Sequence, residues 1–447
     1  MSFSENLAAF RSAHPAVETI ELFMVDLNGI QRGKLVPVAA LDKLAAGTMR
    51  MPCSSLALSI FGGDTEGVGL AIERGDPDGV LRPVAGSLAA LPWAPGRGQI
   101  QVQVAELDGG PAPYDPREVL ARVARRAAGI ELSPVMALEI EFYLIDAERP
   151  CPPVNPVAGG RMESAQIYDM TTSAAFAPMI ERICAAAHAL GAPAEGAIAE
   201  FGPGQFEINL GHVSDALRAA DHMVALKRAI RGVARSSGMD ATFMPKPYGD
   251  MAGSGMHLHL SLKDREGQNV FSGEDETPNL AARHALSGML GSMGDCMLIF
   301  APSANAYRRL MPGSYAPIVA AWGTDNRGTA LRMPEVSGKG ARIEHRTGGA
   351  EANPYLLTAA VLAGALAGLE ATMDPPPPVT GEAGAGDGEG LPLSWQQAIA
   401  CFAQSEFVAD WLGADLQRIY AEMKRQERGV LLSQVPETEY AAYLRTL

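Results

Sequence analysis

The stretch that most constrains the fold is residues 136–145, MALEIEFYLI, because its two faces differ completely. Every second residue is apolar, which is the pattern of a β-strand with one face in a hydrophobic core. The opposite face carries Glu139 and Glu141, whose carboxylates point the same way roughly 7 Å apart, with no lysine or arginine between them. Like charges held this close repel each other and are costly to bury unpaired. The strand therefore predicts nearby positive charge that neutralises the two acids.

Three further stretches divide in the same way into two faces. One face is apolar and packs in the core, and the other, which we call the chemical face, carries polar or charged side chains. Residues 205–210, 253–262 and 341–349 alternate apolar with polar or charged side chains, and Glu200 precedes the first of them, ahead of a Gly-Pro-Gly break. Together with residues 136–145, they predict one curved sheet whose chemical faces line one cleft. The chemical side chains of the three stretches are Gln205, Glu207 and Asn209, then His257, His259 and Ser261, then Arg342, Glu344 and Arg346.

These faces together hold the donor atoms of a divalent-cation site. A single Glu-x-Glu or His-x-His is more often ordinary surface, so the prediction depends on the combination of five carboxylates, two histidines and two arginines. Hard oxygen ligands with one or two imidazoles suit Mg²⁺ or Mn²⁺, whereas softer metals prefer thiolates. The five cysteines are scattered and form no Cys-x-x-Cys pair. We expect two or more divalent ions, each with about three protein ligands, to neutralise the acids.

A cluster of arginines lies in residues 304–334, which hold Arg308, Arg309, Arg327 and Arg332. In a chain with a net charge of −15, such a cluster is suited to bind a polyphosphate and a substrate carboxylate. The sequence contains no P-loop motif and no GxGxxG turn, so neither of those phosphate cradles is predicted.

The acidic composition argues against binding to nucleic acid or to an anionic membrane surface. The chain has no run of 18 uninterrupted apolar residues and its first residues lack the pattern of a signal peptide. We therefore expect a cytoplasmic protein.

Two domains are predicted, at residues 1–107 and 108–447. The first is rich in strands, with a hairpin at 17–38 that turns at Asn28-Gly29 and a further strand at 99–107. The second mixes strands with helices, two of them at 174–191 and 214–238. The Pro-, Gly- and acid-rich residues 373–390 are expected to form a solvated loop without chemistry.

The motifs resemble the glutamine synthetase superfamily over nearly the whole chain, and within it the γ-glutamylpolyamine synthetase (glutamate–putrescine ligase) branch. The resemblance implies an α+β fold with a small N-terminal β-grasp domain and a large catalytic domain whose curved antiparallel sheet lines the active site. It also implies a homo-oligomer of stacked rings, a dodecamer, with active sites shared between subunits. The motifs are E-x-E-F (139–142), GPGQFEINL (202–210), KPYGDMAGSGMHLHLSL (246–262), NAYRRLMPGSYAP (305–317), NRGTALRMP (326–334) and RIEHRTGGAEANPYL (342–356).

The resemblance also assigns roles to single residues. Arg327 matches the catalytic arginine that stabilises a transferring phosphoryl group. The other matches are Glu141, Glu200 and Glu207 for one metal; Glu139, His257 and Glu344 for the second metal; Gly253, Arg309, Arg346 and Tyr315 for the substrate; and His259, Ser261, Arg332 and Arg342 for the nucleotide.

The implied activity is an ATP-dependent amide ligation. The γ-carboxylate of glutamate would attack the γ-phosphate of ATP, and an amine would then displace phosphate from the γ-glutamyl phosphate, leaving ADP and phosphate as products. The phosphorylation is needed because a carboxylate has no good leaving group. Two metals and Arg327 would spread the developing phosphoryl charge.

Two departures from the ammonia-using members point to a different amine, and a third, at Ala252, concerns the recognition of glutamate itself. Tyr315 follows the turn where those enzymes carry a glutamate, and residues 52–55, PCSS, match a stretch that supplies an aspartate to a neighbour's ammonium pocket. An uncharged, partly aromatic pocket favours an amine that carries carbon, such as putrescine, another polyamine or an alkylamine. Ala252 stands where glutamine-forming enzymes have an asparagine that contacts the α-amino group.

Two alternatives remain open: a glutamine synthetase that uses ammonia, and a catalytically silent homologue that binds a metabolite. A guanidino kinase shares related architecture, but the later amide-ligase motifs argue against it.

Overall fold

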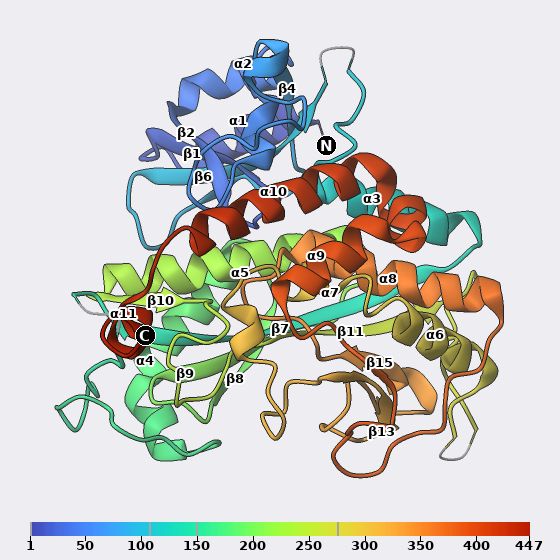
Figure 1. Ribbon diagram of the computed structural model, residues 1–447. Coiled ribbons are helices and arrows are strands. Elements are labelled where there is room, and N and C mark those ends of the chain that lie inside the picture. Colours follow the sequence, from blue (N-terminus) through green and yellow to red (C-terminus); the bar gives the residue numbers. More distant parts are fainter. Residues whose placement is uncertain (1, 107–108, 149–150, 275–276) are drawn as a thin grey trace.

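An N-terminal sheet and a larger curved sheet organise the chain, and several helices lie between them (Figure 1). The computed structural model describes residues 2–106, 109–148, 151–274 and 277–447. The domain boundary predicted between residues 107 and 108 falls on two residues outside these ranges, so it stays a prediction.

The N-terminal sheet contains the predicted hairpin. Its strands β1 (Thr19–Val25) and β2 (Gln31–Pro37) pair antiparallel, and Gly29 in the connecting turn has the positive φ, 75°, that glycine tolerates best. β1 also pairs in parallel with β6 (Arg97–Ala105), which includes most of the strand predicted at 99–107. The remaining elements are β3 (Arg50–Pro52), β4 (Asp78–Pro83), β5 (Ala89–Ala90), α1 (Phe3–Ala13) and α2 (Leu41–Ala45).

The larger sheet unites the four predicted strands. In the order β13-β14-β15-β11-β7-β9-β8, with β10 also paired to β7, these strands are the consecutive members β15, β11, β7 and β9. Among the described residues, the strands of this sheet pair antiparallel except for β13 with β14. The predicted α+β class with a curved, largely antiparallel sheet is confirmed. The strands are β7 (Ser133–Asp146), β8 (Ala194–Ala199), β9 (Gln205–Leu210), β10 (Met239–Thr242), β11 (Met256–Lys263), β13 (Trp322–Thr324), β14 (Leu331–Glu335) and β15 (Arg342–His345).

Strand β7 shows why the sheet divides into two faces. Its apolar side chains are essentially inaccessible to solvent: Met136, Leu138, Ile140, Phe142 and Leu144 are exposed by 1% or less. This face packs against α5 (Ala216–Ser236), which is the helix predicted at 214–238. The other face is thereby left for the cleft, as the period-two pattern requires.

The remaining helices surround the larger sheet. α4 corresponds to the helix predicted at 174–191, and the helix that follows the N-terminal sheet is α3. Their bounds are α3 (Pro116–Gly129), α4 (Met170–Ala189), α6 (Leu280–Gly291), α7 (Met297–Phe300), α8 (Pro354–Ala371), α9 (Trp395–Gln404), α10 (Ala414–Leu432) and α11 (Glu437–Tyr443).

Helix α8 is apolar on all sides because it lies inside the protein. Its length and hydropathy would suit a membrane span, but 78% of the apolar window is buried in the fold, so it is a core helix. α6 packs against it so closely that a Cβ at Gly288 would lie 2.2 Å from the carbonyl oxygen of Gly364 and 2.3 Å from the amide nitrogen of Gly368.

Helix α10 binds the turn of the N-terminal hairpin. Its Glu427 accepts hydrogen bonds from the Asn28 side chain, at 2.9 Å, and from the Ile60 amide, at 2.7 Å. Lys424, which is also buried, donates to Glu427 at 2.9 Å. The N-terminal hairpin turn is thus held by a buried polar network on the C-terminal helix.

Residues 373–390 are anchored more firmly than expected of a solvated loop. Their last two residues form β16 (Glu389–Gly390), which pairs with β12 (Val319–Ala320) as a separate two-stranded sheet. The side chain of Asn326 donates to the carbonyl oxygens of Val379 and Gly381, at 2.9 and 2.8 Å. The loop therefore lies fixed beside the segment that carries Arg327.

Candidate active site

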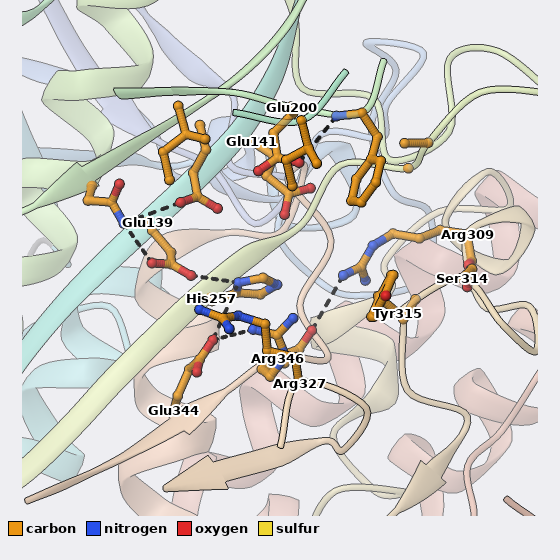
Figure 2. A pocket seen from close by; sticks show the side chains of 18 of the residues that line it. Glu139, Glu141, Glu200, His257, Arg309, Ser314, Tyr315, Arg327, Glu344 and Arg346 are labelled. Atoms are coloured by element: carbon orange, nitrogen blue, oxygen red, sulfur yellow. Dashed lines mark hydrogen bonds and ion pairs between the residues drawn. The ribbon is translucent and has the colours of Figure 1, made fainter. Parts of the chain in front are cut away.

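The chemical face of the larger sheet opens into a cavity of about 410 Å³ (Figure 2). Strands β7, β9, β11, β14 and β15 form its floor, and the segments around residues 168, 200, 253 and 315 form its sides. All but two of the residues to which the sequence assigned a role line this cavity; the exceptions are Ser261 and Arg342.

Strand register explains how acids from distant parts of the chain meet. Glu139 on β7 lies opposite His257 on β11 and opposite Asn209 on β9. Glu141 lies directly opposite Glu207 in the same pairing. Like charges directly opposite each other destabilise a sheet, so the fold carries this arrangement at a cost.

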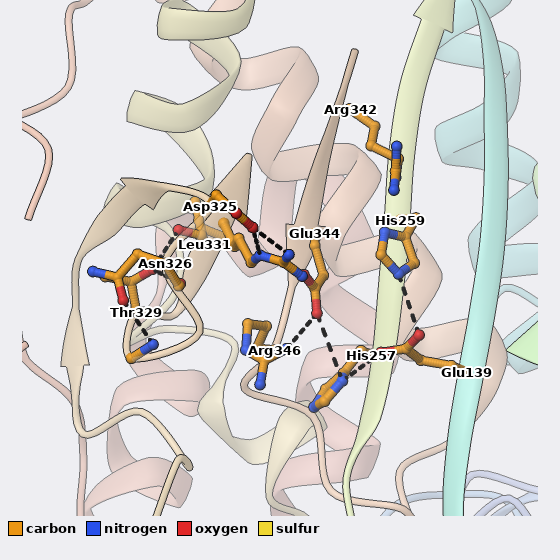
Figure 3. Close-up of polar contacts among 12 residues, drawn as sticks. Glu139, His257, His259, Asp325, Asn326, Thr329, Leu331, Arg342, Glu344 and Arg346 are labelled. Carbon is orange, nitrogen blue, oxygen red and sulfur yellow. Dashed lines mark hydrogen bonds and ion pairs between the residues drawn. The ribbon is translucent and has the colours of Figure 1, made fainter. Parts of the chain in front are cut away.

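The acids in one half of the site have close histidine and arginine partners (Figure 3). His257 Nδ1 lies 2.7 Å from Glu139 Oε1 and 3.8 Å from Glu344 Oε1. Burial opposes ionisation of Glu139, yet contacts with His257 and His259 hold its pKa well below the usual value. Glu344 is buried too, but the nearby Arg346 guanidinium lowers its pKa. These two carboxylates are therefore ionised and partly compensated by the protein itself.

The acids of the other half of the site form no ion pair within the part of the chain that the structure describes. Burial, followed by the charges of Glu139 and Glu141, raises the pKa of Glu207 to about 9. Burial and the charge of Glu141 raise the pKa of Glu200 to about 7. Glu141 accepts a hydrogen bond from the Gly255 amide at 2.8 Å. Three facing carboxylates that form no ion pair with a described side chain favour a bound cation.

The donor atoms fit divalent cations in two overlapping groups. Glu139, His257 and Glu344 offer one atom each within 4.8 Å of one another, as do Glu141, Glu207 and His257. The first group is the set that the resemblance assigns to the second metal. Glu200, assigned to the first metal, lines the same cavity but lies outside the compact groups. Carboxylate oxygens with one imidazole match the preference of Mg²⁺ and Mn²⁺.

Three arginines reach the cavity from the opposite side. Arg309 is buried and donates to the carbonyl oxygen of Thr347 at 3.0 Å, and Arg346 contacts Glu344. Arg327 is exposed and has no ion-pair partner among the described residues. Figure 2 shows Arg309, Arg327 and Arg346 together across the cavity from Glu139 and Glu141. Arg308, the neighbour of Arg309, is exposed and does not line the cavity.

The four residues assigned to the nucleotide divide into two pairs. His259 and Arg332 line the cavity, and Arg332 donates to Glu344 at 2.9 Å. Ser261 lies farther along β11, opposite Val135 near the beginning of β7. Arg342 lies opposite Glu335 and donates to the Gly340 carbonyl oxygen. Any contact of Ser261 or Arg342 with a nucleotide would therefore lie beyond the cavity.

An aromatic wall faces the acids, and the sequence had predicted Tyr315 as part of it but not Phe201 or Tyr168. Phe201 and Tyr315 stack with ring centroids 6.3 Å apart and ring planes 17° apart, and Tyr168 also lines the cavity. Phe201, which follows Glu200 and precedes the Gly-Pro-Gly break, could have been recognised as an aromatic residue beside a candidate ligand. Tyr168 lies in an irregular segment that carries no such signal.

Two small residues fix the floor beneath Arg309. A Cβ at Gly253 would lie 2.7 Å from Cγ of Arg309 and 2.9 Å from the Pro245 carbonyl oxygen, so only glycine fits there. The carbonyl oxygen of Ala252 accepts a hydrogen bond from the Tyr143 hydroxyl at 2.8 Å. The methyl side chain of Ala252 offers no polar contact in the cavity.

Comparison with known proteins agrees with this geometry. The family described as glutamine synthetase, catalytic domain, matches residues 113–443. Gamma-glutamylputrescine synthetase PuuA of Escherichia coli (strain K12) is 37% identical, over 98% of this chain and 94% of its own. Glutamate–isopropylamine ligase of a Pseudomonas species is 31% identical over 96% and 95%. A solved structure described as a GmaS/ADP complex superposes with a TM-score of 0.84 and 30% identity, covering 98% of this chain and 99% of that one.

Proposed function

We propose that this chain, which belongs to the glutamine synthetase family, is an ATP-dependent ligase. It would join the γ-carboxylate of glutamate to a carbon-bearing amine. The reaction would pass through γ-glutamyl phosphate and release ADP and phosphate. The observation that carries the proposal is the stacked pair of Phe201 and Tyr315 beside Glu200, where an amine must approach. Aromatic faces attract both an ammonium group and the methylene chain attached to it.

The arginines have separate tasks in this reaction. Arg309 and Arg346 bind the carboxylates of glutamate, because a guanidinium pairs with a carboxylate through two parallel hydrogen bonds. Arg327 is unpaired among the described side chains and stabilises the phosphoryl group during its transfer. Binding in this geometry places the γ-carboxylate near the phosphoryl group and away from competing water.

The acids hold Mg²⁺ or Mn²⁺, two or more ions per site. Glu139, His257 and Glu344 would bind one ion, and Glu141 with Glu207 another, with Glu200 facing it. Bound there, the ions would supply charge neutralisation for the phosphates of ATP. His259, Ser261, Arg332 and Arg342 are the residues we propose for contacts with the nucleotide.

The resemblance to the same family also leads us to propose an oligomeric state, a location and partners for the enzyme. We propose a cytoplasmic homo-oligomer of stacked rings, a dodecamer, in which residues 52–55 face the active site of a neighbouring subunit. Glutamate, an amine and ATP are its partners, without nucleic acid or membrane, and polyamine breakdown is the setting we propose for its activity. Exposed apolar side chains on the N-terminal half, including Ile60 and Phe61 at about half exposure, are consistent with burial between subunits.

The test is phosphate release from ATP with glutamate and a panel of amines. We expect turnover with 1,4-diaminobutane, longer polyamines and alkylamines, and far weaker turnover with ammonium at the same concentration. Turnover with ammonium alone at low concentration would instead identify a glutamine synthetase. Ligand binding without any turnover would favour the silent metabolite-binding homologue.

A further inference from the structure

A second cavity of about 790 Å³ adjoins the candidate active site. Ser314, Tyr315, Ala316 and Arg327 line both cavities, so the two meet at the aromatic wall. We call the second one the annex cavity. Its other walls are residues 311–319, the loop around residues 326–328 and residues 381–385 of the anchored segment.

The annex cavity is a fixed part of the fold. The Asn326 side chain holds the backbone of residues 379–381 through two hydrogen bonds, as described above. The amide of Val379 donates to the Trp322 carbonyl oxygen at 2.8 Å, and the Trp322 ring nitrogen donates to the Pro376 carbonyl oxygen at 2.7 Å. Residues 381–385 are therefore held opposite the turn that contains Tyr315.

The annex cavity has mainly apolar walls and one charged side chain of each sign among the described residues that line it. Met311, Tyr315, Pro317, Ile318 and Val319 give it apolar walls. Of the described residues that line it, Arg327 carries the positive charge and Glu382 carries the negative charge. Arg327 belongs to the wall shared with the active site, whereas Glu382 belongs to the annex cavity alone.

Glu382 is oriented by the turn that it faces. Its Oε1 accepts a hydrogen bond from the Gly313 amide at 3.0 Å. A carboxylate has two oxygens with about four acceptor positions in all, so Oε2 and the second lone pair of Oε1 are available to a further donor.

We infer that the annex cavity binds the distal ammonium group of an aliphatic diamine, with Glu382 as the residue that determines this specificity. The inference rests on the proposed ligase function and adds the residue that selects a diamine over a monoamine. The reacting amine lies at the Phe201–Tyr315 wall, the methylene chain follows the apolar walls, and the distal ammonium donates to Glu382. Arg327 repels an ammonium at the shared wall, which favours its placement beyond that wall. A monoamine of equal length leaves Glu382 without a partner.

The test compares two substrates of equal length in one assay. For 1,4-diaminobutane and pentylamine, kcat/KM is measured by phosphate release in the unaltered protein and in Glu382→Gln, Glu382→Lys and Glu389→Gln. Glutamine keeps the acceptor for the Gly313 amide but removes the charge. Glu389 is an exposed acid on the same segment, outside the annex cavity, and serves as the matched control.

We expect Glu382→Gln to lower the diamine-to-monoamine ratio of kcat/KM roughly five- to tenfold, Glu382→Lys to lower it further, and Glu389→Gln to leave it unchanged. An unchanged ratio in the Glu382 variants, or loss of activity with both amines alike, would overturn the role of Glu382 while leaving the ligase function intact. Absence of turnover with every amine in the unaltered protein would overturn the ligase function and the inference with it.

Discussion

Phe201 and Tyr315 stack in the wall of the candidate active site, with their ring centroids 6.3 Å apart. The two residues come from different loops, and Tyr315 adopts a positive φ of 56°, which is unfavourable for a residue with a side chain. The surrounding turn holds it there, since the Ser314 hydroxyl donates to the Arg309 carbonyl oxygen at 3.0 Å. Strain of this kind concentrates at ligand-binding positions, in agreement with an amine-binding site that has aromatic side chains in its wall.

Replacement of Phe201 tests the aromatic wall. We expect Phe201→Ala to raise KM for alkylamines about tenfold, because an aromatic contact with a cation or a methylene chain contributes about 1 kcal/mol or more. KM for ATP should change little, and Phe201→Tyr should retain amine binding. Steady-state kinetics with each substrate varied in turn would check this. An equal rise in KM for ATP and for the amine would refute a specific role in amine binding.

Replacement of Glu207 tests the cation site. We expect Glu207→Gln to abolish turnover and to reduce the rise in melting temperature on adding Mn²⁺. Without metal at neutral pH, the variant should be more stable than the unaltered protein, by about 1 kcal/mol or more, because Glu207, whose pKa is raised to about 9 opposite Glu141, must take up a proton on folding, whereas glutamine need not. Thermal unfolding with a chelator and with Mn²⁺ measures both effects. An undiminished Mn²⁺ effect would remove Glu207 from the ligand set.

Adjacent arginines allow a matched test of substrate binding. Arg309 is buried at the cavity, and Arg308 beside it is exposed and outside the cavity. Arg309→Lys should raise KM for glutamate by about tenfold or more, since lysine cannot pair with a carboxylate through two parallel hydrogen bonds. Arg308→Lys should leave it unchanged. Similar effects of the two substitutions on KM for glutamate would exclude Arg309 as the carboxylate-binding residue.

Helix packing behind the sheet can be tested in the same way. Gly288→Ala should destabilise the protein by about 1–3 kcal/mol, because the added methyl group would collide with the backbone of α8. Gly291→Ala, on the same helix but with open space around its Cβ position, is the control and should have little effect. Denaturant unfolding would compare them. Equal stability of the two variants would contradict the close packing of α6 and α8.

Local pattern predicted the part of the site that lies on strands. The alternation in residues 136–145 is enforced by burial of one face, so the outward direction of Glu139 and Glu141 followed from the sequence. The same rule placed His257 and Glu344 on the cleft side. It could not show where along each strand the cavity ends, and Ser261 therefore shares a face with His257 but lies outside the cavity.

The rest of the site depends on how loops meet in three dimensions. Nothing in the sequence pairs Phe201 with Tyr315, because each ring is placed by its own turn. The anchoring of residues 373–390 was also missed, since Asn326 binds backbone carbonyl oxygens there, which are present at every residue and leave no pattern. Glu382 consequently read as one more acid in a solvated loop.

The most direct test of the account is a competition in a single reaction. The protein is supplied with ATP, glutamate, Mg²⁺, 1,4-diaminobutane and a tenfold excess of ammonium, and the products are identified by mass spectrometry. We predict that the γ-glutamyl amide of the diamine is the dominant product, formed together with ADP and phosphate. Glutamine as the dominant product would contradict the account.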